Sequence, residues 1–174
     1  MLGQTSNPML SQCEQGIQAK VPANMQTNFM KVVHAGLTIM YAPQTKDLLQ
    51  KGIAASNDPA KEAAAGATRL ISNLYQQSGK TLPIALVVPT AMIFAFEYLD
   101  LVAKAGKAQI TPDMISTTTT AVSDALLPLL GVTKDKLASM AAAAKQQQPQ
   151  GGASAPQAPA APAPGGIIAG QQGA

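Results

Sequence analysis

The chain has 174 residues, of which 47% are hydrophobic and 12% charged, about half the charged fraction usual for a soluble domain. Its net charge of +3 is small and dispersed, which argues against a nucleic-acid-binding protein. One cysteine and one histidine exclude an internal disulfide and a structural zinc site made from Cys and His ligands.

The first ten residues have neither the basic stretch nor the apolar core of a secretory signal. We therefore expect a protein that is made and kept in a cytoplasm.

Helix starts are indicated at three places where a short polar residue precedes proline: Asn7-Pro8, Asp58-Pro59 and Thr111-Pro112. The polar side chain can accept a hydrogen bond from a free backbone N–H, and proline at the first helical position sacrifices no hydrogen bond. Thr133 predicts a fourth start, because its hydroxyl can cap the helix and Asp135 lies in the first turn, where the helix dipole favours a carboxylate.

Apolar residues after these starts recur every three or four positions, which is the period of a helix with one buried face. Small residues at 63–66 would let a neighbouring helix approach closely. Four consecutive threonines at 117–120 have weak helix propensity, but the apolar period around them still predicts a helix. We expect helices at about 8–19, 23–41, 44–55, 59–78, 84–105, 112–130 and 134–146.

The fifth of these helices contains an uncharged run at 81–96, in which Pro89 offers an alternative start to residue 84. As a helix this run would reach roughly 24 Å, short of the ~30 Å hydrocarbon core of a bilayer. The run therefore predicts a helix at the centre of a bundle, surrounded by its neighbours, and a transmembrane span is the less favoured alternative.

These elements predict an all-α fold, in which residues 1–145 form one compact bundle of six or seven helices joined by short connections. Residues 146–174 are rich in Pro, Ala, Gln and Gly and have no ionisable side chain, so a disordered C-terminal tail is expected. A passive spacer is the favoured interpretation of the tail, and a flexible arm that binds through Ile167 and Ile168 is the alternative.

Few residues suggest chemistry. His34 adjoins an apolar pair, which favours a partly buried side chain with a backbone partner over a catalytic base. Cys13 is expected to be a small packed thiol. Glu97 and Asp100 would share a helix face, as two acids flanking a substrate or metal would. The favoured interpretation is that they mark where the fifth helix emerges into solvent, with Lys104 pairing with Asp100.

The phosphate-loop motif GxxxxGK(S/T), the dinucleotide-binding motif GxGxxG and the metalloprotease motif HExxH do not occur. The SGKT string at 78–81 resembles the end of a phosphate-binding loop, but Leu74 stands where that motif needs its first glycine. We therefore predict that the protein is not an enzyme and has no catalytic, cofactor-binding or metal-binding residues, and that it needs no cofactor.

Three strings carry a resemblance: NPMLSQCEQGIQAKVPANMQTNFMKVVHAGLTIMY, LYQQSGKTLPIALVVPTAMIFAFEYLDLVAKAG and ITPDMI with the later LLPLLGVTKDKL. They resemble small helical virion-associated structural proteins of tailed bacteriophages, over about residues 7–140. The likeness lies in the overall pattern, so no site residue is transferred. It implies a component that is built into a phage particle or packaged inside it.

The expected function is a non-enzymatic structural component of a tailed-phage virion, made in the bacterial host cytoplasm. Its partners would be other virion proteins or copies of itself, bound through helix faces, and no nucleic acid is expected. One alternative is an internal, ejected protein that engages the host membrane through residues 81–96. The other is a cytoplasmic phage assembly or host-interaction factor.

Overall fold

The computed structural model describes residues 5–131, which form six α-helices and one short 3-10 helix and contain no strand. The all-α bundle predicted from the sequence is therefore confirmed for this part of the chain. The predicted helix at 134–146 and the predicted tail at 146–174 lie outside the described residues. The elements in chain order are α1 (Pro8–Lys20), η1 (Ala23–Met25), α2 (Gln26–Met40), α3 (Pro43–Ala55), α4 (Pro59–Gln77), α5 (Ile84–Lys104) and α6 (Pro112–Leu126).

The three predicted caps that fall within the described residues form hydrogen bonds at the helix starts. Asn7 Oδ1 accepts from the backbone N–H of Met9 at 2.9 Å and begins α1. Asp58 and Thr111 accept in the same way from the third residue of α4 and α6, at 3.1 and 3.2 Å. Local side-chain chemistry therefore places these helix ends, as the sequence indicated.

Proline has opposite effects in two helices. α5 begins at Ile84 and continues through Pro89, so the alternative start at Pro89 is wrong. α6 ends at Leu126, before the predicted end at 130, and Pro128 follows it. Pro128 has no N–H to continue the helical hydrogen bonds, and the chain closes instead with a turn at Gly131, whose φ is +67°.

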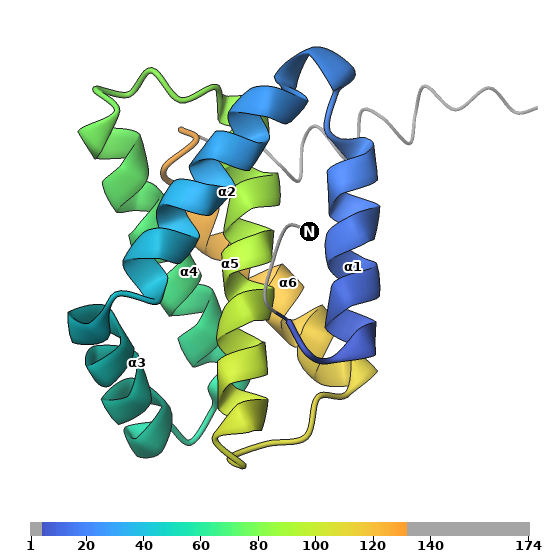
Figure 1. Ribbon diagram of the computed structural model, residues 1–174, viewed down its shortest axis with the longest axis vertical. Coiled ribbons are helices and arrows are strands. Elements are labelled where there is room, and N and C mark those ends of the chain that lie inside the picture. The colour runs from blue at the N-terminus through green and yellow to red at the C-terminus, as the bar shows by residue number, and fades with distance from the viewer. Residues whose placement is uncertain (1–4, 132–174) are drawn as a thin grey trace, which may run out of the picture.

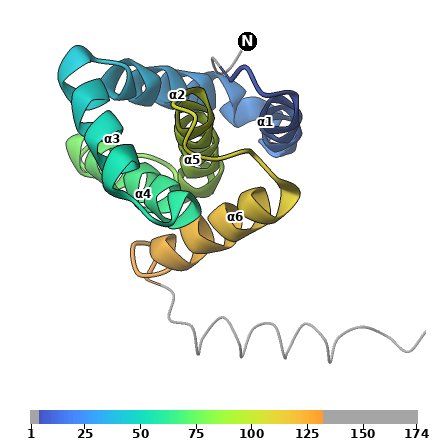
Figure 2. The same cartoon turned by 90° about the horizontal axis from the view of Figure 1, so that it is seen from below.

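Helix α5 is the centre of the molecule. Figure 2 shows it surrounded by α1, α2, α4 and α6, all of which pack against it. Every residue from Thr90 to Asp100 is buried, including the carboxylates Glu97 and Asp100 that follow the uncharged run, so neighbours enclose this part of α5 on all sides. The prediction of a central bundle helix is thus confirmed.

α4 and α2 approach α5 closely because each has a glycine, which carries no side chain, at the contact. A Cβ atom at Gly66 of α4 would lie 2.9 Å from Cε2 of Tyr98, and one at Gly36 of α2 would overlap the ring of Phe94. Ala63 and Ala67 of α4 are completely buried. The close approach predicted for the small residues at 63–66 is therefore present.

Helix α1 occupies a more isolated position. It lies along one side of the bundle and packs chiefly on α5, whereas α4 packs against α2, α3, α5 and α6 (Figure 1). Its fully buried Leu10 belongs to the same apolar cluster as Phe96, Leu99 and Val102 of α5. The half-buried Cys13 packs against this cluster, in agreement with a packed thiol.

Candidate functional site: a buried carboxylate cluster

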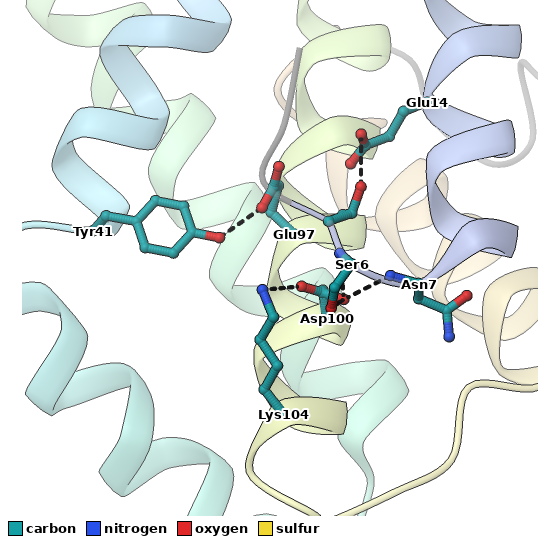
Figure 3. A network of polar contacts seen from close by, with 8 residues as sticks. Ser6, Asn7, Glu14, Tyr41, Glu97, Asp100 and Lys104 are labelled. Atoms are coloured by element: carbon teal, nitrogen blue, oxygen red, sulfur yellow. Dashed lines mark hydrogen bonds and ion pairs between the residues drawn. The ribbon is translucent and has the colours of Figure 1, made fainter. Parts of the chain in front are cut away.

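Three carboxylates are buried where α1 meets α5. Glu14 of α1 is 4% exposed, and Glu97 and Asp100 of α5 are 0% and 1% exposed. Charged groups are rarely removed from water to this extent, because desolvation is costly unless partners or protonation compensate for it. Each carboxylate has a different set of partners, which the network in Figure 3 displays.

Asp100 binds the segment that precedes α1. Its Oδ1 accepts from the backbone N–H of Ser6 at 3.1 Å, from the Ser6 hydroxyl at 3.0 Å and from the backbone N–H of Asn7 at 3.2 Å. Its Oδ2 pairs with Nζ of Lys104 at 2.6 Å, one helical turn along α5. A single side chain of α5 thus holds the entry to α1 (Figure 3).

Glu97 accepts a hydrogen bond from the Tyr41 hydroxyl at 2.6 Å, across the contact between α5 and the end of α2. Burial raises the pKa of Tyr41 well above its ordinary value, and the hydrogen bond to Glu97 raises it further. The phenol therefore remains a hydrogen-bond donor at every physiological pH. This bond joins α2 to the same turn of α5 that faces α1.

Glu14 is the least satisfied of the three carboxylates. Its Oε2 accepts from the Thr5 hydroxyl at 3.1 Å, whereas its buried Oε1 has no hydrogen-bond partner within residues 5–131. Burial raises the pKa of Glu14 to about 7, and the nearby charges of Glu97 and Asp100 add to the rise, against the Thr5 hydrogen bond. The cluster therefore contains one carboxyl that can hold a proton near neutral pH.

The structure corrects the expectation for Glu97 and Asp100. They do not mark the emergence of the fifth helix into solvent, because both are enclosed by the segment before α1 and by α1 and α2. The predicted pairing of Asp100 with Lys104 is confirmed. Within the described part of the chain, no group of three or more His, Cys, Asp and Glu side chains is arranged to hold a metal ion.

The remaining predicted residues lie away from this cluster or contribute only by packing. His34 is exposed on α2, so the expectation of a partly buried side chain is wrong. Its backbone carbonyl accepts from the hydroxyl of Thr38, one turn later. The string at 78–81 forms the exposed turn after α4, with the Thr81 hydroxyl donating to the carbonyl of Ser78.

Sequence reasoning missed Glu14, Tyr41 and the segment of Thr5 and Ser6. A signal for Glu14 was available, since it follows Leu10 by four positions and precedes Ile17 by three. This spacing places it on the buried stripe of α1. The partners of Tyr41 and Ser6 lie 56 and 94 residues away in the sequence, and no local pattern indicates such pairings.

Comparison of the chain with protein-family models, with curated proteins and with solved structures gives no match. The chemistry of the cluster is therefore interpreted from its geometry. Its groups join three parts of the fold to α5: the segment before α1, α1 itself and the end of α2.

Proposed function

We propose that this chain is a non-enzymatic structural component of a tailed-bacteriophage virion that acts through helix-mediated protein contacts. The resemblance of residues 7–140 to helical virion proteins supports this proposal. So does the use of the buried acidic groups, whose bonds connect elements of the fold to one another. Its partners would be other virion proteins or further copies of the chain.

The observation that carries the proposal is an apolar surface on the outer side of the bundle. Leu48 of α3 is 69% exposed and Ile39 of α2 is 37% exposed, and both line a groove of about 350 Å³ between α2, α3 and α4. Arg69 and Asn73 of α4 supply polar groups at the same groove. An apolar centre with polar neighbours is the usual composition of a protein-contact surface.

Mass spectrometry of purified particles from the source phage tests the proposal, with this chain quantified against the major capsid protein. A fixed ratio between the two is the expected result. A chain that is absent from particles, and monomeric after purification, would contradict the proposal.

A pair of variants then tests the surface itself. Leu48→Glu should lower incorporation into particles without unfolding the chain, because the side chain is already exposed. Gln44→Glu adds the same charge at another exposed position of α3 and should leave incorporation unchanged. If both variants are incorporated equally, α3 does not take part in the contact with other virion proteins.

A second candidate function is an internal, ejected protein that engages the host membrane with residues 81–96. In the described residues, α5 is the one helix long and apolar enough to cross a bilayer, although 72% of its most apolar 18-residue stretch is buried in the bundle. Engagement would therefore require the bundle to open. Membrane engagement is measured with phosphatidylethanolamine–phosphatidylglycerol vesicles, by flotation of the protein with them and by leakage of their contents. If neither occurs at any pH, this second function is rejected.

A cytoplasmic assembly or host-interaction factor is the remaining alternative. It would be abundant in infected cells and missing from finished particles. The mass-spectrometric experiment on particles, extended to infected-cell lysates, distinguishes it from the virion component.

A further inference from the structure

The N-terminal part of the described chain covers one side of α5. α1 contributes Leu10 and the half-buried Cys13 and Ile17 to the apolar cluster that also contains Leu99 and Val102 of α5. α1 packs chiefly on α5, and Gln26 of α2 also donates a hydrogen bond to the carbonyl of Gln18 near the end of α1, at 2.7 Å. The contacts of α4 with α2, α3 and α6 do not involve α1. If α1 left, this side of the central helix would be exposed to solvent.

Residues 5–7 fasten this cover through polar groups. Thr5 donates to Glu14 of α1, whereas Ser6 and Asn7 together donate three hydrogen bonds to Asp100 of α5. The short segment thus lies between the two helices and is bound to both, as Figure 3 shows. Its attachment depends on carboxylate acceptors at each end.

The charges around Glu14 oppose its ionisation in the closed arrangement. The groups that face it are Glu97 and Asp100 from α5 and the Tyr41 phenol from the end of α2. The cation of this network, Lys104, pairs with Asp100. A proton on Glu14 removes its repulsion with both acids of α5 and neutralises a buried carboxyl whose Oε1 has no hydrogen-bond partner among the described residues.

We propose that α1 and residues 5–7 form a cover over α5 whose closure takes up one proton, at Glu14. The cover is closed in the protonated state. When α1 separates from α5, Glu14 enters water, leaves the charges of Glu97 and Asp100 behind and releases its proton. Rising pH therefore favours the open state, in which the apolar side of α5 becomes accessible. This device is independent of the virion assignment.

The pH range follows from the two states of one carboxyl group. The pKa of Glu14 is about 7 when the cover is closed, against 4.5 for an ordinary glutamate. Between these values the closed state holds more protons than the open one, so the open fraction rises with pH. Above about pH 7 both states are ionised, and the open fraction becomes independent of pH at this site.

Cys13 reports the opening without any engineered label, because it is the only cysteine and lies half-buried on the inner side of α1. The rate of its reaction with a pyridyl disulfide, divided by the rate of an unstructured cysteine peptide at the same pH, measures its accessibility. We expect this ratio to rise about thirty-fold from pH 5 to pH 8, most of it below pH 7, and then to level off. A ratio that does not change over this range would overturn the proposal.

Two glutamine substitutions identify the group. Glu14→Gln imitates the protonated state and should keep the normalised rate low and constant from pH 5 to pH 8. The control Glu62→Gln removes a carboxylate of α4 that neighbours Tyr98 and should retain the pH dependence of the unaltered chain. If both variants retain it, another group is responsible and the assignment to Glu14 fails.

Thr5→Val provides a second variant should Glu14→Gln fold poorly. It removes the hydrogen bond that favours the ionised form of Glu14 in the closed state, so the rise in reactivity should continue to a higher pH before it levels off. An unchanged pH profile would contradict the role of this bond.

Amide hydrogen exchange separates local opening from global unfolding. The amides of α1 should exchange faster than the interior amides of α4 at each pH, with little dependence on low urea concentrations. Equal protection of α1 and α4 at every pH would show that they open only together, and the cover would be rejected.

Discussion

The two sides of α5 are held by different forces. Toward α2 and α4 the contacts are mainly apolar, with the Tyr41–Glu97 hydrogen bond at the end of α2, and they depend on Gly36 and Gly66 leaving room for the rings of Phe94 and Tyr98. Toward α1 the apolar contact of Leu10 is combined with buried carboxylates that need particular partners and protonation states. The first kind of contact depends on shape and the second also on pH, so one helix can be fixed on one side and releasable on the other.

The largest effect is expected on the apolar side. Phe94→Ala removes a completely buried ring and leaves a cavity, which should lower the free energy of unfolding by about 4 kcal/mol. Urea denaturation at pH 5 and pH 8 measures this loss. The loss should be equal at the two pH values, and a large difference would mean that the apolar contact and the carboxylate cluster are coupled.

A smaller and pH-dependent effect is expected from Glu14. Its folded pKa is raised, so the folded state holds the extra proton between pH 4.5 and about 7 and stability falls as pH rises through this range. The pKa difference predicts a loss of about 2 kcal/mol from pH 5 to pH 8, after allowance for partial solvent screening. Urea titrations across this range measure it.

Glu14→Gln is the matched test of this prediction. It should be more stable than the unaltered chain at pH 8 and should lack this component of the pH dependence. A variant that is less stable at pH 8 would show that ionised Glu14 contributes favourably, contrary to the prediction.

Tyr41→Phe should cost a comparable or slightly smaller amount, about 1.5 kcal/mol, because it removes the donor of a hydrogen bond to a buried carboxylate. Thermal or urea unfolding at pH 7 gives the value. Tyr75→Phe is the control, since its half-buried ring packs against the apolar core away from the cluster. It should change stability by less than about 0.5 kcal/mol.

The smallest effect is expected at Gly16 of α1, where an added Cβ would meet no atom within 4 Å. Gly16→Ala should stabilise the protein by about 0.5 to 1 kcal/mol through helix propensity. Gly36→Ala should instead destabilise it, because the Cβ would overlap the ring of Phe94. If both substitutions change the free energy of unfolding in the same direction, the contact of α2 with α5 does not require a glycine at position 36.

Much of the fold could be predicted because its signals are local. Asn7, Asp58 and Thr111 cap helices through backbone groups two or three residues away, so the sequence identifies their roles. Pro89 and Pro128 show the limit of such rules. Both remove an N–H, yet α5 continues through the first, which is half-buried, and α6 ends before the second.

The carboxylate cluster was only half predictable. The spacing of Glu97 and Asp100 places them on one side of a helix, and the pairing of Asp100 with Lys104 follows from their separation of one turn. Their burial does not follow, because it depends on α1 and Tyr41, which are distant in the sequence. The charge of Glu97 and Asp100 suggested that they would be exposed to solvent, but their tertiary hydrogen-bond partners allow them to be buried.

The contact between Gly36 and Phe94 also fixes the register of α2 along α5. α2 has one glycine, so a slide by one turn, about 5.4 Å, would bring Val32 or Met40 under the ring, where no space is left for a side chain. Tyr41 follows Gly36 by five residues, and Glu97 follows Phe94 by three. The absence of a side chain at Gly36 therefore sets the position along α5 at which the Tyr41 hydroxyl meets Glu97.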